Sequence, residues 1–162
     1  MTQHIRPAPI RKSVIVKAPP ETAFEVFTAG MGRWWRPEHH IGKAALRDVV
    51  AEPHAGGRWY EVDVDGSECD WGRVLVWDPP RRVTLAWQLN AEWRFDSEFE
   101  TEVDVTFTPE NGGTRVDFEH RYLERYAEKA AEVSAALDSP DGWTGGLAAF
   151  AALAEGRPPH PV

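Results

Sequence analysis

The stretch EFETEVDVTFTPENGGTRVDFEHRY, residues 98–122, decides the fold of this chain. Its two halves have a period of two and are joined by Asn111-Gly112-Gly113. In the first half Phe99, Thr101, Val103, Val105 and Phe107 oppose Glu98, Glu100, Glu102, Asp104 and Thr106, and in the second Val116, Phe118, His120 and Tyr122 oppose Arg115, Asp117, Glu119 and Arg121. This alternation predicts a β-hairpin with one face buried and the other in water.

The same period of two extends upstream of the hairpin. It predicts strands over residues 10–17, 44–52, 58–65, 70–78 and 82–89, besides 98–108 and 114–122. The breaks between them hold turn residues such as Asp65-Gly66 and Asp78-Pro79-Pro80. Because most of these breaks are short, successive strands should pair as hairpins, which predicts a curved antiparallel sheet of six to seven strands.

Helical spacing occurs before and after this sheet region. Pro19-Pro20 suits the first turn of a helix, so residues 20–29 are predicted to form a short amphipathic helix, followed by a second short turn. Residues 123–137 are predicted to be helical, and the last helix covers roughly 141–155. Its apolar stripe and the buried sheet face must cover each other. We therefore predict one α+β domain over residues 10–155, with flexible ends at 1–9 and 156–162.

Composition narrows the classes of function. The net charge of −8 disfavours nucleic acid. A single cysteine, Cys69, excludes an internal disulfide and fits a reducing compartment, and the start of the chain has no secretory signal. The longest apolar stretch is too short to span a membrane, so we predict a cytoplasmic protein. Eight tryptophans in 162 residues predict either one large core or the wall of a ligand site.

Seven motifs, in this order and spacing, resemble the SRPBCC superfamily, the START and pollen-allergen group with a helix-grip fold. They are APPETAFEVF (18–27), WWRP (34–37), GGRWY (56–60), DG (65–66), GRV (72–74), DPPRRVTLAW (78–87) and DGW (141–143). Within the superfamily the chain resembles the C-terminal domain of the activator of the ninety-kilodalton heat-shock-protein ATPase. The resemblance implies a curved sheet wrapped around the C-terminal helix, with two short helices after the first strand.

The resemblance also implies a cavity between the sheet and the C-terminal helix. Our candidates for its wall are Trp34, Trp35, Tyr60, Arg73, Trp87, His120, Tyr122, Trp143, Leu147 and Phe150. Apolar contact would supply the affinity for a small hydrophobic or amphipathic molecule, and one or two polar groups would orient it.

Two polar residues on the strands have alternative interpretations. His120 lies in phase with Phe118 and Tyr122, so it is either a satisfied core histidine or a pocket group that orients a ligand or moves a proton. Arg73 lies in phase with Trp71, and it is either a buried cation or a surface side chain. Residue parity favours the surface interpretation but does not decide between the two.

Other motifs point to no further chemistry. Glu38, His39, His40 and His54 do not have metal-ligand spacing, so no metal is predicted. Cys69 is interpreted as a passive thiol, and no nucleotide fingerprint or phosphate loop predicts a cofactor. The pair Gly145-Gly146 either precedes the last helix or keeps space open for a ligand inside it.

Three hypotheses of function follow. The first is a binding module for a small hydrophobic molecule, acting as a monomer or homodimer. The second is an enzyme of the polyketide cyclase or dehydratase kind, with His120 as the candidate catalytic residue, although the sequence offers no complete catalytic set. The third is a chaperone-associated protein-binding module. It ranks last, because 162 residues leave no room for the activator's separate chaperone-binding domain and the outward faces are charged.

Overall fold

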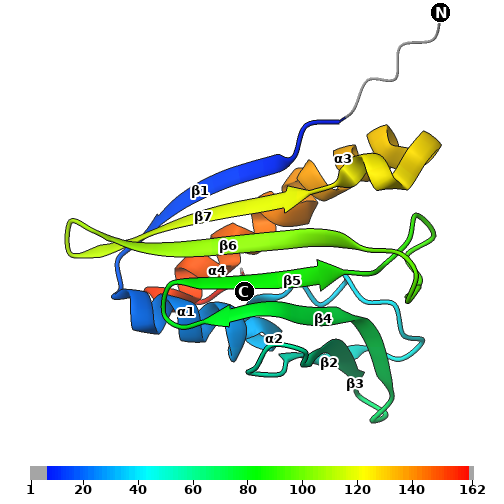
Figure 1. Cartoon of the computed structure of the whole chain (residues 1–162). Coiled ribbons are helices and arrows are strands. Elements are labelled where there is room, and N and C mark those ends of the chain that lie inside the picture. The colour runs from blue at the N-terminus through cyan, green and yellow to red at the C-terminus, as the bar shows by residue number, and fades with distance from the viewer. Residues whose placement is uncertain (1–6, 161–162) are drawn as a thin grey trace, which may run out of the picture.

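The computed structural model describes residues 7–160 and contains one curled antiparallel sheet (Figure 1). The seven strands lie in the order β1-β7-β6-β5-β4-β3-β2. Their bounds are β1 Ile10–Val16, β2 Leu46–Ala51, β3 Arg58–Asp63, β4 Glu68–Asp78, β5 Arg82–Trp87, β6 Thr101–Glu110 and β7 Gly113–Arg121. The chain therefore makes a meander from β2 to β7, and β1 pairs with the last strand.

Helices cover one face of this sheet, behind the strands in Figure 1. They are α1 (Pro20–Thr28), α2 (Met31–Trp34), the 3-10 helix η1 (Leu123–Lys129), α3 (Ala130–Asp138), the π-helical turn η2 (Pro140–Thr144) and α4 (Gly145–Ala154). Helix α4 packs against α1, α2 and β1. The predicted helix-grip fold is confirmed. Of the ends predicted to be flexible, residues 1–6 and 161–162 lie outside the described residues.

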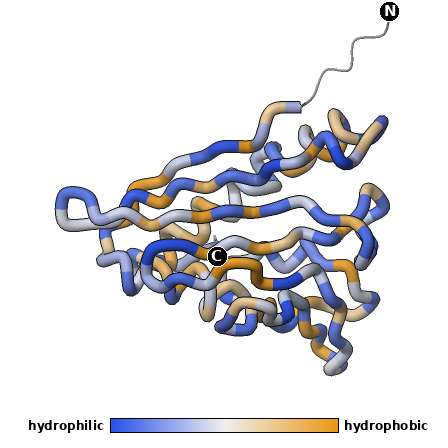
Figure 2. The backbone as a smooth tube through the Cα atoms, in the orientation of Figure 1, coloured by the Kyte–Doolittle hydropathy of each residue, from blue (hydrophilic) through white to orange (hydrophobic). Residues whose placement is uncertain are grey.

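The hairpin of β6 and β7 has the two faces that the sequence predicts. Val103, Val105, Val116 and Phe118 are buried, whereas the charged residues between them stay partly exposed. Figure 2 shows this alternation as changes of colour along the strands. Such a period of two places half of each strand on the helix-covered face, where the core forms.

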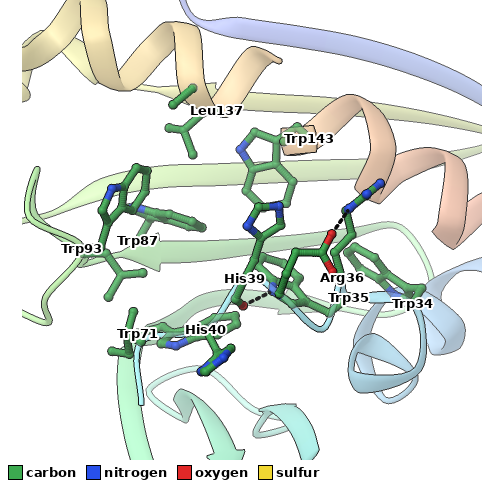
Figure 3. A pocket seen from close by; sticks show the side chains of 16 residues that line it. Trp34, Trp35, Arg36, His39, His40, Trp71, Trp87, Trp93, Leu137 and Trp143 are labelled. Atoms are coloured by element: carbon green, nitrogen blue, oxygen red, sulfur yellow. Dashed lines mark hydrogen bonds and ion pairs between the residues drawn. The ribbon is translucent and has the colours of Figure 1, made fainter. Parts of the chain in front are cut away.

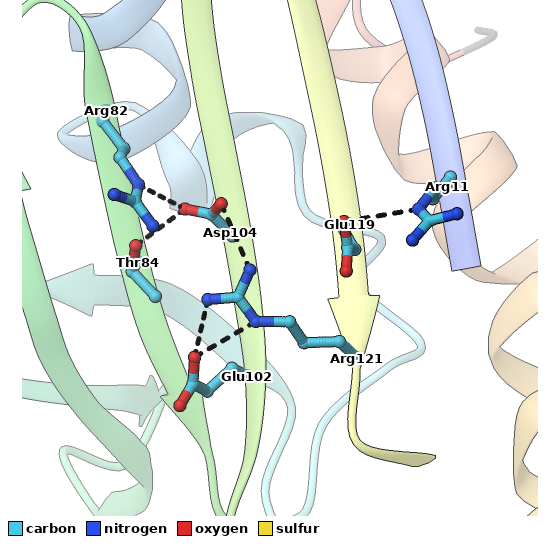
Figure 4. Close-up of polar contacts among 7 residues, drawn as sticks. All are labelled: Arg11, Arg82, Thr84, Glu102, Asp104, Glu119 and Arg121. Carbon is cyan, nitrogen blue, oxygen red and sulfur yellow. Dashed lines mark hydrogen bonds and ion pairs between the residues drawn. The ribbon is translucent and has the colours of Figure 1, made fainter. Parts of the chain in front are cut away.

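The outer face of the sheet carries a ladder of ion pairs between neighbouring strands (Figure 4). Arg82 and Arg121 both contact Asp104, and Arg121 also lies 2.8 Å from Glu102. Burial opposes the charge of Asp104, but hydrogen bonds from Arg82 and Thr84 hold its pKa below the usual value. Each exposed pair adds at most about 1 kcal/mol, so the ladder supports strand register more than total stability.

The helical region after β7 differs from the single predicted helix over 123–137. Tyr122 leaves β7 with a φ of 68°, and Ala127 breaks the helix with φ 55° and ψ −124°. The break separates η1 from α3. Both pieces still face the core through the buried Leu123, Tyr126 and Leu137.

Gly145 and Gly146 both lie inside α4, at its first two positions. A Cβ on Gly146 would lie 3.6 Å from Cζ3 of Trp34, an ordinary contact. A Cβ on Gly145 would lie 2.5 Å from the carbonyl oxygen of Pro140 and 2.7 Å from a guanidinium nitrogen of Arg36. The two glycines therefore have different structural requirements.

We expect alanine to have opposite effects at these two glycines. Gly146→Ala should stabilise the protein by up to about 1 kcal/mol, because alanine favours the helix and meets no clash. Gly145→Ala should destabilise it by roughly 1–3 kcal/mol, because the new methyl group overlaps backbone. Urea denaturation of both variants measures the difference. Equal changes in the free energy of unfolding would show that the two glycines do not differ in the space around them.

Candidate functional site

A cavity of about 340 Å³ lies between the sheet, α2 and the chain that leads into α4 (Figure 3). Six of the eight tryptophans line this cavity, which we call the tryptophan pocket. Its volume is within the range of small-molecule sites, about 300–1,000 Å³. The lining consists of Trp34, Trp35, Arg36, Glu38, His39, His40, Ile41, Trp71, Trp87, Leu89, Trp93, Ala136, Leu137, Gly142, Trp143 and Gly146.

The tryptophans reach the pocket from separate parts of the chain and pack on one another. Trp35 lies at the centre, with its ring centroid 4.8 Å from that of Trp71 and 5.6 Å from that of Trp143. Trp143 in turn lies 5.7 Å from Trp87. Tilted and edge-to-face aromatic pairs stabilise by about 0.5–1.5 kcal/mol each beyond area burial. The walls are therefore held in place before any ligand enters.

Five of the six indole N–H groups of the pocket are already bonded. Trp34 donates to the Val26 carbonyl, Trp35 to the His39 carbonyl, Trp71 to Glu61, Trp87 to the Tyr126 hydroxyl and Trp143 to His120. The distances are 2.9–3.1 Å. A satisfied donor has no reason to turn toward a ligand. These five side chains therefore offer ring faces and edges rather than hydrogen bonds.

His120 lies one layer beneath the pocket and is fully buried. Its Nδ1 accepts from the Trp143 indole at 3.1 Å, so the proton of the neutral ring is on Nε2, which donates to Thr101 Oγ1 at 2.8 Å. Burial lowers the pKa of His120 to about 3. Both nitrogens are occupied and the ring is neutral, so this geometry supports the interpretation as a satisfied core histidine.

The polar side chains of the pocket all come from residues 36–40. The Arg36 Nε donates to Glu38 at 2.9 Å. A backbone hydrogen bond, followed by this bond and the Arg36 charge, lowers the pKa of Glu38. The Nε2 of His39 donates to the Asp141 carbonyl at 2.6 Å, because a carbonyl only accepts. The Nδ1 of a neutral His39 is then an acceptor. In Figure 3 the His39 ring points toward Trp143, and Arg36 lies beside it.

The structure brings together part of the predicted wall. Trp34, Trp35, Trp87 and Trp143 line the pocket. Leu147 and Phe150 are buried in the core behind it, where Phe150 packs against Phe27 at 5.3 Å. Tyr60, Arg73 and Tyr122, which the sequence also suggested as wall residues, do not line the pocket.

Tyr60 is on the outer face of β3, with the Arg58 guanidinium 4.0 Å from its ring centre. The inward residues of this strand are Trp59, Glu61 and Asp63. Tyr122 lies past the end of β7, where the chain turns away from the sheet and the Arg125 guanidinium stands 4.4 Å from its ring centre. Cation contact on a partly exposed ring explains both positions.

Arg73 is half-exposed and pairs with Glu100 at 2.6 Å, as the surface interpretation expects. The alternation of odd and even positions does not show which face of β4 carries Arg73, because the register of this strand shifts twice. One shift lies opposite Trp59–Tyr60 and the other between Val74 and Val76. Trp71 and Val74 consequently are both buried although three residues apart. The bulges also explain why Trp71, a pocket residue, was not predicted.

Sequence reasoning also missed Trp93 and the polar residues 36–40 as lining groups. Trp93 lies in the loop between β5 and β6 with a φ of 60°, and its side chain remains 41% exposed at the pocket. The signal that could have found it was the tryptophan count itself. For His39 and His40 the sequence raises only a metal interpretation, which their spacing does not support.

Residues 17–155 match the family described as activator of Hsp90 ATPase homolog 1-like protein. The chain belongs to this family. Its AHSA1-like domain is part of the SRPBCC superfamily, whose fold is typical of ligand binding. None of the helices in residues 7–160 has the length and apolar character that crossing a membrane requires. No curated protein matches the domain.

Two solved structures are similar to the AHSA1-like domain in sequence as well as fold. The anthrahydroquino-γ-pyrone synthase Txn09, complexed with SUM, is 41% identical over 82% of this chain and 88% of its own, with a TM-score of 0.59. The self-sacrificing resistance protein CalC from Micromonospora echinospora is 33% identical over 91% of this chain and 94% of its own, with a TM-score of 0.65. Protein NE0264 from Nitrosomonas europaea, at 16% identity and a TM-score of 0.65 over 91% of this chain and 94% of its own, shares the fold alone.

Proposed function

We propose that this AHSA1-like domain binds a planar, amphipathic aromatic molecule in the tryptophan pocket. The observation that carries the proposal is the convergence of six tryptophan side chains on one cavity of about 340 Å³. With most indole N–H groups already bonded, affinity would come from stacking and apolar burial. A flat fused-ring molecule presents the largest area to such walls.

The polar residues 36–40 are the groups proposed to orient the ligand. They line one side of the cavity, whereas the remaining lining residues carry apolar side chains or none. His39 and Arg36 can bond to a hydroxyl or carbonyl at one edge of a ring system. The similarity to a synthase named for an anthrahydroquino-γ-pyrone supports a polycyclic ligand with oxygen substituents.

Binding of hydroxylated anthraquinones tests the proposal, with linear fatty acids as the comparison set. Calorimetric titration should give saturable one-to-one binding for the fused-ring compounds and weaker binding for the fatty acids. Trp93→Ala should weaken the binding about 10- to 100-fold, because it removes one exposed wall of the pocket.

Phe95→Ala is the matched control for Trp93→Ala. Phe95 belongs to the same loop and is 39% exposed, but it does not line the pocket. Its removal should leave the affinity within about twofold of the wild-type value. Equal losses in the two variants, or no binding by the wild-type protein, would refute the proposed site.

A second candidate function is cyclisation of such a molecule, and the 41% identity to Txn09 favours it. His39 would then be the group that moves a proton, because the nitrogens of His120 are both engaged beneath the pocket. Chromatography with mass spectrometry, after incubation with an anthraquinone that carries an open, enolisable ketone side chain, separates the two functions. Recovery of the unchanged compound supports a binding protein, and a cyclised product, with or without loss of water, supports an enzyme.

The chaperone-associated function has less support. The large exposed apolar side chains of residues 7–160 are Ile15, Val64, Trp93 and Phe95, which lie in three separate segments. A protein-binding surface usually has a contiguous apolar patch. The cytoplasmic location stays a prediction from the sequence.

A further inference from the structure

Two carboxylates and one imidazole meet beside the tryptophan pocket. Glu61 and Asp63 are two residues apart on β3, so both point to its inner face, and both are fully buried. His40 comes from the loop after α2 and also lines the pocket. One ligand atom from each of the three lies within 4.8 Å of the others.

Glu61 is held in position by three donors. It accepts from the backbone N–H of Ile41 at 2.7 Å, from that of Gly42 at 3.1 Å and from the Trp71 indole at 2.9 Å. Gly42 also packs tightly on the pair, since a Cβ there would overlap an Asp63 oxygen. Glu61 is thus a pre-positioned carboxylate.

Asp63 has no such donors. Both of its oxygens and the Nδ1 of His40 are buried without a hydrogen-bond partner. An unpaired buried carboxylate costs several kcal/mol, and a second carboxylate beside it raises the cost. Within residues 7–160 no donor therefore compensates the Asp63 carboxylate.

We propose that His40, Glu61 and Asp63 bind a divalent transition-metal ion such as Zn²⁺ at the edge of the tryptophan pocket. Two carboxylates balance the charge of the ion, and the imidazole nitrogen favours zinc over magnesium or calcium. Three protein ligands leave a coordination position for water or a ligand oxygen. The site does not depend on the proposed ligand.

Local spacing in the sequence does not indicate this metal site. His40 stands near Glu38, His39 and His54, whereas its partners Glu61 and Asp63 come from a strand 21 and 23 residues further on. The three residues come together only in the folded protein, where the loop after α2 packs on β3.

Titration of the full chain with Co²⁺ and Zn²⁺ at neutral pH tests the site. We expect one ion per chain, a visible Co²⁺ absorption band of a four- or five-coordinate site, and a melting temperature that Zn²⁺ raises. Asp63→Asn and His40→Ala should each weaken binding at least about 100-fold, as loss of a ligand does. His54→Ala removes an exposed histidine outside the cluster and should bind as the wild-type protein does.

Absence of Co²⁺ and Zn²⁺ binding by the wild-type chain would overturn the proposal. Binding that survives Asp63→Asn would also overturn it, since the ion would then sit elsewhere. Metal binding is measured without any aromatic ligand. Failure of this site therefore says nothing against the tryptophan pocket.

Discussion

Acidification from pH 7 to pH 4 is expected to lower the free energy of unfolding by about 3 kcal/mol through His120 alone. Burial lowers the pKa of His120 from 6.5 to about 3 in the folded protein. Between about pH 6.5 and pH 3, His120 is therefore protonated in the unfolded chain but neutral in the folded protein. The stabilisation is complete above pH 6.5 and is lost progressively as the pH falls toward 3, by about 1.4 kcal/mol per pH unit.

Urea denaturation at a series of pH values measures this loss, and His120→Gln isolates it. Glutamine can still accept from Trp143 and donate to Thr101, but it does not titrate. The variant should lack the His120 share of the slope below pH 6.5, and the two slopes should coincide above pH 7. Other titrating groups are common to both proteins and cancel in the comparison. Parallel slopes at all pH values would show that His120 is not buried as a neutral ring.

Blocking the pocket from α3 should abolish ligand binding without unfolding the protein. Ala136 lines the cavity, yet it is exposed to solvent. In Ala136→Trp, an indole can therefore occupy part of the cavity of about 340 Å³ without displacing core residues. We expect affinity for the hydroxylated anthraquinones to fall at least about 100-fold, or roughly 2.7 kcal/mol.

Ala135→Trp is the control for this experiment. Ala135 is the preceding residue of α3 and is equally exposed, but it does not line the pocket. Both substitutions should change the free energy of unfolding by no more than about 0.5 kcal/mol, because they fall on an exposed helix surface. Calorimetry and urea denaturation of the two variants provide the comparison. Similar affinities would place the ligand outside the tryptophan pocket.

The hairpin of β6 and β7 was predictable because its alternation is uninterrupted. Every inward position from Thr101 to Phe107 is buried, so the alternation in the sequence correctly predicts which side chains lie on the buried face. Turn residues then set the meander, and the apolar stripe of the last helix required a sheet to cover it.

The candidate site was only partly predictable because it is built where regularity ends. Bulges in β4 change the face of Trp71, and a positive φ turns Trp93 toward the pocket. Tyr60 was assigned to the wrong face because the neighbouring Trp59 occupies the core position. A one-residue shift reverses every side chain of a strand, and parity does not reveal where such a shift occurs.

The amino-acid sequence by itself determined the strands and their meander, the covering helix and the superfamily, since periodicity and turn chemistry are local properties. It did not determine that β1 pairs with β7. Tertiary structure alone decided which tryptophans line a cavity, why His120 is a bonded core residue, and that His40 meets Glu61 and Asp63. Those outcomes depend on contacts between residues far apart in the chain. The free energy that favours them comes from the burial and hydrogen bonding of side chains against other parts of the chain, so the sequence of one strand or loop does not reveal it.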